Sequence, residues 1–367
     1  MQRLALMVIV PLALLTLMGL ALLWPFSGIP DSGYAPAEQQ GARVISVNSK
    51  PCADGIEQEP NGCGTATIEL DKDAEIGKSL EVELPSGPGE PVISAGDRVW
   101  VISGDALGEE THTIVDHQRA NYLWILCLAF VLALLAFGRW RGITALVGLA
   151  ATFLMLLFFV VPAILAGESP ILVAVVGTSA IALTVLYLTH GFSLTTTIAV
   201  LGTLGALVLT GLLALLFVGA MHLSGITDDV AQSVYVTHGV NMQGLLIAAI
   251  MIGSLGVLDD VTVTQSATVA ELAHANPESS FGELYGAASR IGRAHIGSVV
   301  NTIILAYAGS SLPLLVVIVA DNSSFGSIAS TQLIAQEIVR SGVATIGLIA
   351  AVPITTALAT WAARRSR

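Results

Sequence analysis

Eight long apolar segments are the feature that most restricts how this chain can fold. A helix needs roughly 20 apolar residues to cross about 30 Å of hydrocarbon, and each segment is close to that length. The segments are residues 4–25, 122–138, 143–165, 170–189, 195–221, 243–263, 295–320 and 343–362. We therefore predict an all-α polytopic membrane bundle of about eight transmembrane helices.

Composition supports a membrane environment. Hydrophobic residues make up 54% of the chain and charged residues only 11%, whereas a soluble domain carries about 25% charged residues. The first apolar segment is longer than the roughly 7–15 residues of a signal-peptide core, and no small-residue cleavage site follows it directly. Residues 1–26 are therefore interpreted as an uncleaved transmembrane anchor, in preference to a cleaved signal peptide.

Lys and Arg beside the apolar segments predict the orientation, because cytoplasmic loops of membrane proteins are enriched in these residues. The residues placed inside are Arg3, Arg139, Arg141, Arg290, Arg293, Arg364, Arg365 and Arg367, against Arg119 and Arg340 outside. Both termini are thus predicted to be cytoplasmic, and residues 27–120 to lie outside the cytoplasm. Residues 222–242 and 321–342 fit either surface helices or re-entrant segments.

Residues 27–120 form an acidic insert between the first two apolar segments. They contain 17 of the 27 acidic residues but only 6 of the 15 Lys and Arg residues. Strict alternation in TATIEL and SLEVEL predicts strands with one buried face, and PSGPGEP and SAGD supply turns. About five short strands predict a small extracytoplasmic β-barrel or sandwich of the OB type. The sequence contains no basic patch that would indicate a nucleic-acid partner.

Two cysteines, Cys52 and Cys63, lie in one segment of this insert, KPCADGIEQEPNGCG. A disulfide can form outside the cytoplasm, and closing so short a loop stabilises a fold by roughly 2–3 kcal/mol. We predict a Cys52–Cys63 disulfide, with two free thiols as the alternative. The third cysteine, Cys127, lies in the second apolar segment, where we expect it to contribute packing.

Asp259 and Asp260 stand at the end of the sixth apolar segment. Counted from Gln243, they lie about 24–26 Å along a helix, in the cytoplasmic third of the bilayer. An ionised Asp costs about 2.5–3.5 kcal/mol at the centre of a span and less toward its edge. The simple alternative is a span that ends earlier and leaves both carboxylates in water.

Polar residues continue from this aspartate pair and recur on the next apolar segment, at the three- and four-residue spacing of a helix face. Two facing polar stripes with a nearby guanidinium could satisfy a carboxylate within the membrane. The sequence therefore predicts a proton- or ion-coupling site, with either aspartate as the protonatable group. Its residues would be Asp260, Asp259, Thr264, Gln265, Arg293, Ser298, Asn301 and Thr302.

Other kinds of site find little support. The sequence has no Walker loop, dinucleotide fingerprint, HExxH or CxxC, and no spacing indicates a nucleophile–base pair. His222, Asp228, Asp229 and His238 are metal-ligand residue types, but their spacing matches no metal-binding template. The two aspartates are better explained as the start of a short helix. We predict no enzyme activity, no metal site and no cofactor.

Two blocks, GLLIAAIMIGSLGVLDDVTVTQSATVAEL and SRIGRAHIGSVVNTIILAYAGSSLPLL, resemble the YibE/F family of bacterial multi-span membrane proteins. The similarity also includes AGDRVWVI, IVDHQRANYLWIL, FGRWRGITAL and VVPAILAGESPIL. Where the family reads like LGAVMDVA, this chain has LGVLDDVT, so Asp260 aligns with the family aspartate and Asp259 is a departure. Asn301 and Thr302 match the family's Asn-Thr pair. The resemblance implies a polytopic domain over residues 121–367, without a substrate or reaction.

The order of features also resembles the SecD/SecF export proteins and related proton-driven permeases. In these, an outer domain follows the first span, and an Asp-bearing span leads through an Arg-containing connector into a span rich in Ser, Thr and Asn. LDDVTVTQSATVAEL followed by SRIGRAHIGSVVNTI has the same order, which would place Asp260 at the proton-carrying position. This chain departs by having two more predicted spans and no basic residue after the Asp stripe.

We expect a permease or a proton-coupled accessory factor for transport or export. Its partners would be the lipid bilayer and a proton or another ion. The alternative is an envelope assembly or structural factor whose outer β-domain binds a protein partner. A homo-oligomer is compatible with either function.

Overall fold

The computed structural model describes residues 2–26, 28–29, 39–50, 61–71, 79–87, 89–106, 109–320, 326 and 329–365. These residues form two compact units. One unit comprises Met1–Ser32 together with Gly138–Arg367, and the other comprises Gly33–Phe137. Cys52 lies outside the described residues, so the Cys52–Cys63 disulfide stays a prediction.

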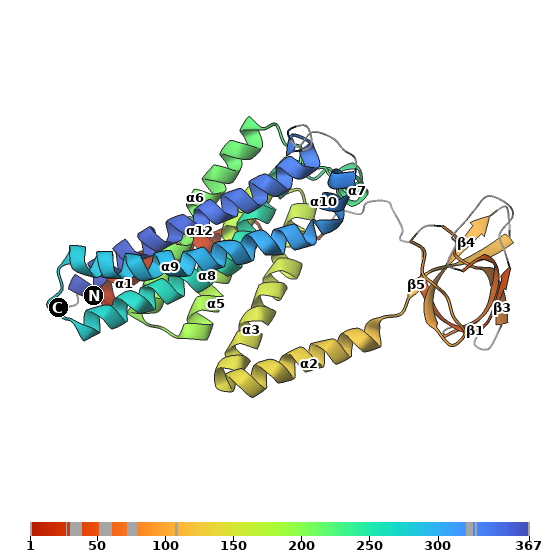
Figure 1. Ribbon diagram of the computed structural model, residues 1–367, viewed down its shortest axis with the longest axis horizontal. Helices are drawn as coiled ribbons and strands as arrows, with labels where there is room; N and C mark the ends of the chain where they lie inside the picture. The colour runs from red at the N-terminus through yellow and green to blue at the C-terminus, as the bar shows by residue number, and fades with distance from the viewer. Residues whose placement is uncertain are drawn as a thin grey trace. The chain divides into compact units, whose positions relative to one another are not determined.

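The unit Gly33–Phe137 contains a five-stranded antiparallel sheet (Figure 1). Its strands are β1 (Gln39–Lys50), β2 (Cys63–Leu70), β3 (Ser79–Glu83), β4 (Arg98–Ala106) and β5 (Glu109–His117). The strand order is β3-β2-β1-β4-β5. The helix α2 (Ala120–Gly138) follows β5 and has no buried residue.

One face of this sheet is buried, as the alternation predicted. Val44 pairs with Ile68 across β1 and β2, and Ala66 pairs with Val82 across β2 and β3. These four side chains are no more than 4% exposed and belong to one apolar core. The prediction of short strands with one buried face is therefore confirmed.

The prediction of a closed barrel or a two-sheet sandwich is wrong for the described residues. They form one open sheet with β3 and β5 at its edges, and no hydrogen-bonded ladder joins these two strands. Alternation along a strand shows which face is buried. It does not show whether the edge strands pair, because closure depends on backbone register and strand tilt.

The second unit is a helical bundle (Figure 1). Its helices are α1 (Gln2–Leu22), α3 (Trp140–Met155), α4 (Val161–Leu165), α5 (Pro170–His190), α6 (Leu194–Ala220), α7 (Asp229–His238), α8 (Met242–Ala275), α9 (Phe281–Ser310), α10 (Leu312–Ala320) and α12 (Gln332–Arg365). A π-helical turn, Leu156–Val160, joins α3 to α4. Several helices begin with a polar N-cap residue whose side chain accepts a backbone hydrogen bond. At the start of α9, Ser280 forms a capping box with Glu283.

Six of the described helices are long and apolar enough to cross a membrane, against the eight predicted. They are α2, the continuous stretch Trp140–Leu165, α5, α6, α8 and α12. The first predicted span corresponds to α1 (Gln2–Leu22), of which Met7–Leu22 is described as a shorter apolar helix. The predicted span 295–320 is broken, since α9 ends at Ser310 and α10 begins at Leu312. Polar residues within α9 also lower its hydropathy.

The two segments left open by the sequence begin or form helices. Within residues 222–242, Asp228 caps the ten-residue helix α7 by accepting a hydrogen bond from the backbone N–H of Ala231. This confirms the predicted role of Asp228 at a helix start. Within residues 321–342, the described part from Gln332 onward is the first section of α12.

The centre of the bundle is formed by α6, α8 and α12, which pack against one another. Gly202 of α6 lies against Thr355 of α12, and Gly347 of α12 lies against Thr210 of α6. These two contacts show that α6 and α12 are antiparallel. A side chain at either glycine would overlap the facing threonine hydroxyl. Small residues of this kind let membrane helices approach closely enough for dispersion contacts to hold them together.

We expect Gly347→Ala to lower the stability of the bundle by about 1–3 kcal/mol, because the added methyl group overpacks the contact with Thr210. Thr210→Ala in the same chain should restore most of the loss, since it removes the overlapping hydroxyl. Gly342→Ala is the matched control on the same helix, where a Cβ would meet no atom within 4 Å. Thermal unfolding of the purified protein measures all three, and equal effects at the two glycines would contradict this packing.

Candidate functional site

Asp259 and Asp260 both line a cavity of about 890 Å³ between α3, α5 and α8. Asp259 is part-buried, whereas Asp260 is exposed on the cavity wall. The Oδ1 atom of Asp259 is buried and has no hydrogen-bond partner among the described residues. The walls of α3 and α8 contribute Gly148, Gly253 and Gly256. Gly256 leaves open space on this wall, since a Cβ there would meet no atom within 4 Å.

Asp259 stands at the end of a short chain of hydroxyl groups. Thr203 of α6 interacts with the Asp259 side chain, and its hydroxyl lies 2.7 Å from that of Thr262. Thr262 in turn lies 3.2 Å from the backbone carbonyl of Asp259, to which it can donate. A hydroxyl both donates and accepts, so the Thr203–Thr262 hydrogen bond can run in either direction as Asp259 gains or loses a proton. The Asp259 carbonyl only accepts.

Two basic side chains share the cavity with the aspartates. Arg141 lies near the start of α3 and His190 at the end of α5. The Nδ1 atom of His190 lies 2.7 Å from the Thr189 hydroxyl, which is also on the cavity wall. Neither basic group forms an ion pair with Asp259 or Asp260 in the described residues. The cavity therefore presents separate acidic and basic groups on a mainly apolar wall.

A model of the YibE/F-like protein family matches residues 126–365. The chain belongs to this family. The matched range covers well over half of the chain and includes every wall of the cavity, whereas the five-stranded sheet lies outside it. No curated protein and no solved structure matches the chain. Family membership and the six long apolar helices together indicate a membrane protein.

The cavity of this YibE/F-like chain includes only two of the residues predicted for the coupling site, Asp259 and Asp260. Thr264 is exposed on α8 and does not line the cavity. Gln265 is buried elsewhere and joins three helices. Its Nε2 atom donates to the Ala288 carbonyl of α9, at 3.0 Å, and to the Thr356 hydroxyl of α12, at 2.7 Å. Gln265 therefore has a structural role in the bundle.

The predicted residues on α9 are all exposed and lie outside the cavity. They are Arg293, Ser298, Asn301 and Thr302. The face of α9 that packs into the core is apolar instead and includes Ile296, Val299 and Ile303. The Arg293 Nε donates to the Ser289 carbonyl of its own helix, at 3.3 Å. The structure thus does not bring these polar residues to the aspartates.

Sequence reasoning missed three groups around α8. Thr203 gives no signal, because a threonine in an apolar helix is common and its contact depends on the packing of α6 against α8. Glu337 and Arg340 form an ion pair of 2.8 Å near the start of α12, and their i,i+3 spacing could have predicted it. Tyr307 of α9 interacts with both charges. A Cβ at Gly253 would lie 3.5 Å from its hydroxyl.

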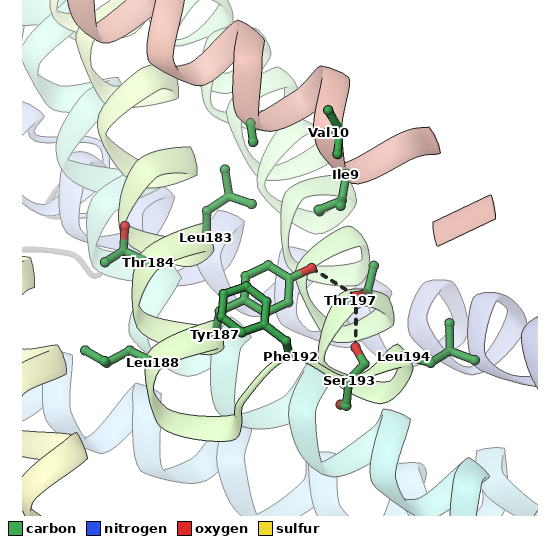
Figure 2. A pocket seen from close by; sticks show the side chains of 11 residues that line it. Ile9, Val10, Leu183, Thr184, Tyr187, Leu188, Phe192, Ser193, Leu194 and Thr197 are labelled. Carbon is green, nitrogen blue, oxygen red and sulfur yellow. Dashed lines mark hydrogen bonds between the residues drawn. The ribbon is translucent and has the colours of Figure 1, made fainter. Parts of the chain in front are cut away.

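A second cavity, of about 750 Å³, lies between α1, α5 and α6 and is mainly apolar (Figure 2). Its Tyr187 ring stacks on Phe192, and the Tyr187 hydroxyl lies 2.9 Å from that of Thr197. This cavity has no carboxylate or basic group on its wall. Among the described residues, no group of three or more His, Cys, Asp or Glu is placed to hold a metal ion.

We expect water to reach the aspartate cavity but not the opposite face of α8. In a Cys127→Ser background, Asp260→Cys and Gly256→Cys should react with a water-soluble thiol reagent several-fold faster than Val261→Cys, because thiolates form in water. Val261 is the matched control, since it is 1% exposed and faces the core. Rates of modification in intact membranes measure this, and equal rates at all three positions would contradict a wet cavity.

Proposed function

We propose that this chain is an ion-coupled membrane permease or transport accessory factor in which protons bind at the aspartate pair of α8. The observation that carries the proposal is the position of Asp259, whose Oδ1 atom is buried without a partner at the wall of a large cavity. Ionisable groups within membrane helices are costly and typically mark ion pathways or proton relays.

The two aspartates are suited to different steps. Asp260 is exposed on the cavity wall and can exchange a proton with water there. Asp259 is part-buried beside Thr203, so the hydroxyl chain through Thr262 can accommodate both of its charge states. Proton binding at Asp259 removes a charge from the interior of the bundle, which changes the electrostatic field in the cavity. A solute in that cavity would then be bound differently in the two protonation states.

Arg141 and His190 support binding of a solute in the same space. Arg141 supplies positive charge on the wall formed by α3, and the His190 imidazole supplies a hydrogen-bonding group on the wall formed by α5. A neutralised carboxylate no longer competes for a nearby positive charge, so that charge attracts an anionic ligand more strongly. Protonation of the aspartates would leave these basic groups to bind an anionic part of a substrate.

We expect Asp259→Asn to lower proton flux by at least about tenfold, because the amide cannot take part in proton transfer. The measurement uses the purified protein in liposomes with an imposed pH gradient and a pH-sensitive dye inside. Asp260→Asn should lower the flux as well. Asp229→Asn, in the exposed first turn of α7, is the matched control and should transport normally. Unchanged flux with both cavity substitutions present, at normal membrane abundance, would contradict the proposal.

The alternative function, envelope assembly through the β-domain, gives a different result. If residues 27–120 on an unrelated membrane anchor restore the phenotype of cells that lack the protein, the helical bundle is only an anchor. In that case the aspartate substitutions should also leave cells unaffected. Restoration that requires the bundle and its aspartates supports the permease.

We further propose that residues 27–120 lie outside the cytoplasm and that Cys52 pairs with Cys63 there. In a Cys127→Ser chain, an impermeant maleimide applied to intact cells should label the protein only after reduction. Labelling without reduction would contradict the disulfide, since both thiols would then be free to react. Labelling only after the membrane is broken would place the insert inside, where a reducing environment also disfavours a disulfide.

A further inference from the structure

The exposed face of α9 carries several polar side chains beside exposed apolar ones such as Leu305, although its neighbours are membrane-length apolar helices. α9 packs along α8 and α12 (Figure 1), and both of these are long and apolar enough to cross a membrane. α9 has 30 residues but is not among the six helices that meet this description. Its exposed residues Ser298, Asn301 and Thr302 contribute to this difference. A lipid-facing surface of this composition would be unfavourable.

Contacts with α8 place Asn301 at the depth of the aspartates. Gln265, late in α8, donates a hydrogen bond to the Ala288 carbonyl near the beginning of α9. Gly253, earlier in α8, lies beside the Tyr307 hydroxyl near the end of α9. The two helices are therefore antiparallel. Asn301 precedes Tyr307 by about 9 Å along α9, and the same step along α8 leads from Gly253 to Asp259. Asn301 thus lies level with Asp259, well within the length of the spans.

The Asn301 amide has no hydrogen bond to any other described residue, whereas the Thr302 hydroxyl is satisfied by the Ser298 carbonyl at 3.1 Å. An amide transferred from water into hydrocarbon without a hydrogen-bond partner is strongly unfavourable. Within its own compact unit, no described residue covers this face, because a Cβ at Gly297 or Gly309 would meet no atom within 4 Å. The Asn301 amide is therefore available to a partner from outside the bundle.

We propose that this face of α9 is the interface between two copies of the chain, with Asn301 of each copy bonded to Asn301 of the other. An amide carries both a donor and an acceptor, so it is complementary to itself across a two-fold axis. All copies insert into the membrane in one orientation, so the same residue meets itself at the same depth. A single asparagine at such a position is known to specify how helices pair.

The residues around Asn301 suit a close helix pair. Ala294, Gly297 and Ser298 precede it on the exposed face, and small residues allow membrane helices to approach until interhelical hydrogen bonds can form. Leu305 follows one turn later and is also exposed, which supplies apolar contact next to the amide pair. This inference concerns the opposite side of α9 from the core and does not depend on proton coupling at Asp259.

Disulfide cross-linking of the full chain in native membranes tests the interface directly. In a Cys127→Ser background, Asn301→Cys treated with a copper oxidant should give a reducible dimer, several-fold more than Leu212→Cys. Leu212 is the matched control, because it lies on the exposed face of another membrane-length helix, α6, and is 59% exposed. Cross-linking of Asn301→Cys no stronger than this control would overturn the proposal. A cross-link to a different protein would overturn it too.

Dimerisation of chains without added cysteines gives a second readout. Asn301→Leu should weaken association in liposomes by roughly 3- to 30-fold, the range measured for interhelical hydrogen bonds in membranes. Asn301→Gln keeps the amide and should retain most of the association. Fluorescence energy transfer between labelled copies, at a series of lipid dilutions, measures both. Equal association of wild type and the leucine variant would show that Asn301 is not at the interface.

Discussion

The close approach of α6 and α12 is the contact on which the rest of the bundle depends. Apolar surface gains nothing from leaving lipid for another apolar surface, so membrane helices associate through tight packing and interhelical hydrogen bonds. Gly202 facing Thr355 and Gly347 facing Thr210 supply two such contacts, about 12 Å apart along each helix. Two separated contacts set both the crossing and the register of the pair.

The pair of α6 and α12 determines the orientation of α8 within the bundle. α8 bonds to α6 through Thr262 and Thr203, and to α12 through Gln265 and Thr356. Because Thr262 and Gln265 form these hydrogen bonds in the core, they fix the rotation of α8 about its own axis. Its remaining face, with glycines and the aspartates, then lines the cavity with α3 and α5. The polar contacts in the core therefore place the acidic groups of the candidate site.

The same rotation explains why two adjacent aspartates differ. Neighbouring residues on a helix point about 100° apart, so one carboxylate is directed toward Thr203 of α6 while the other stays exposed in the cavity. Family resemblance favoured Asp260, because it aligns with the family aspartate. The structure makes Asp259 the part-buried member with an unpartnered oxygen. Within a permease, the departure at position 259 would add a buried carboxylate beside an exposed one.

The sequence by itself determined the long apolar helices and the strands with one buried face. It also identified the aspartate pair as the residues that are energetically most costly to place in a membrane helix. These follow from periodicity and composition, which are local properties of the chain. Tertiary structure decided the open sheet, the break at Ser311 and the partners of each polar residue. Polar residues on a membrane helix have the same local sequence pattern whether they line a cavity, as the aspartates of α8 do, or face the outside of the bundle, as Asn301 of α9 does. Only the packing of neighbouring helices distinguishes the two, because it decides which face of each helix is covered.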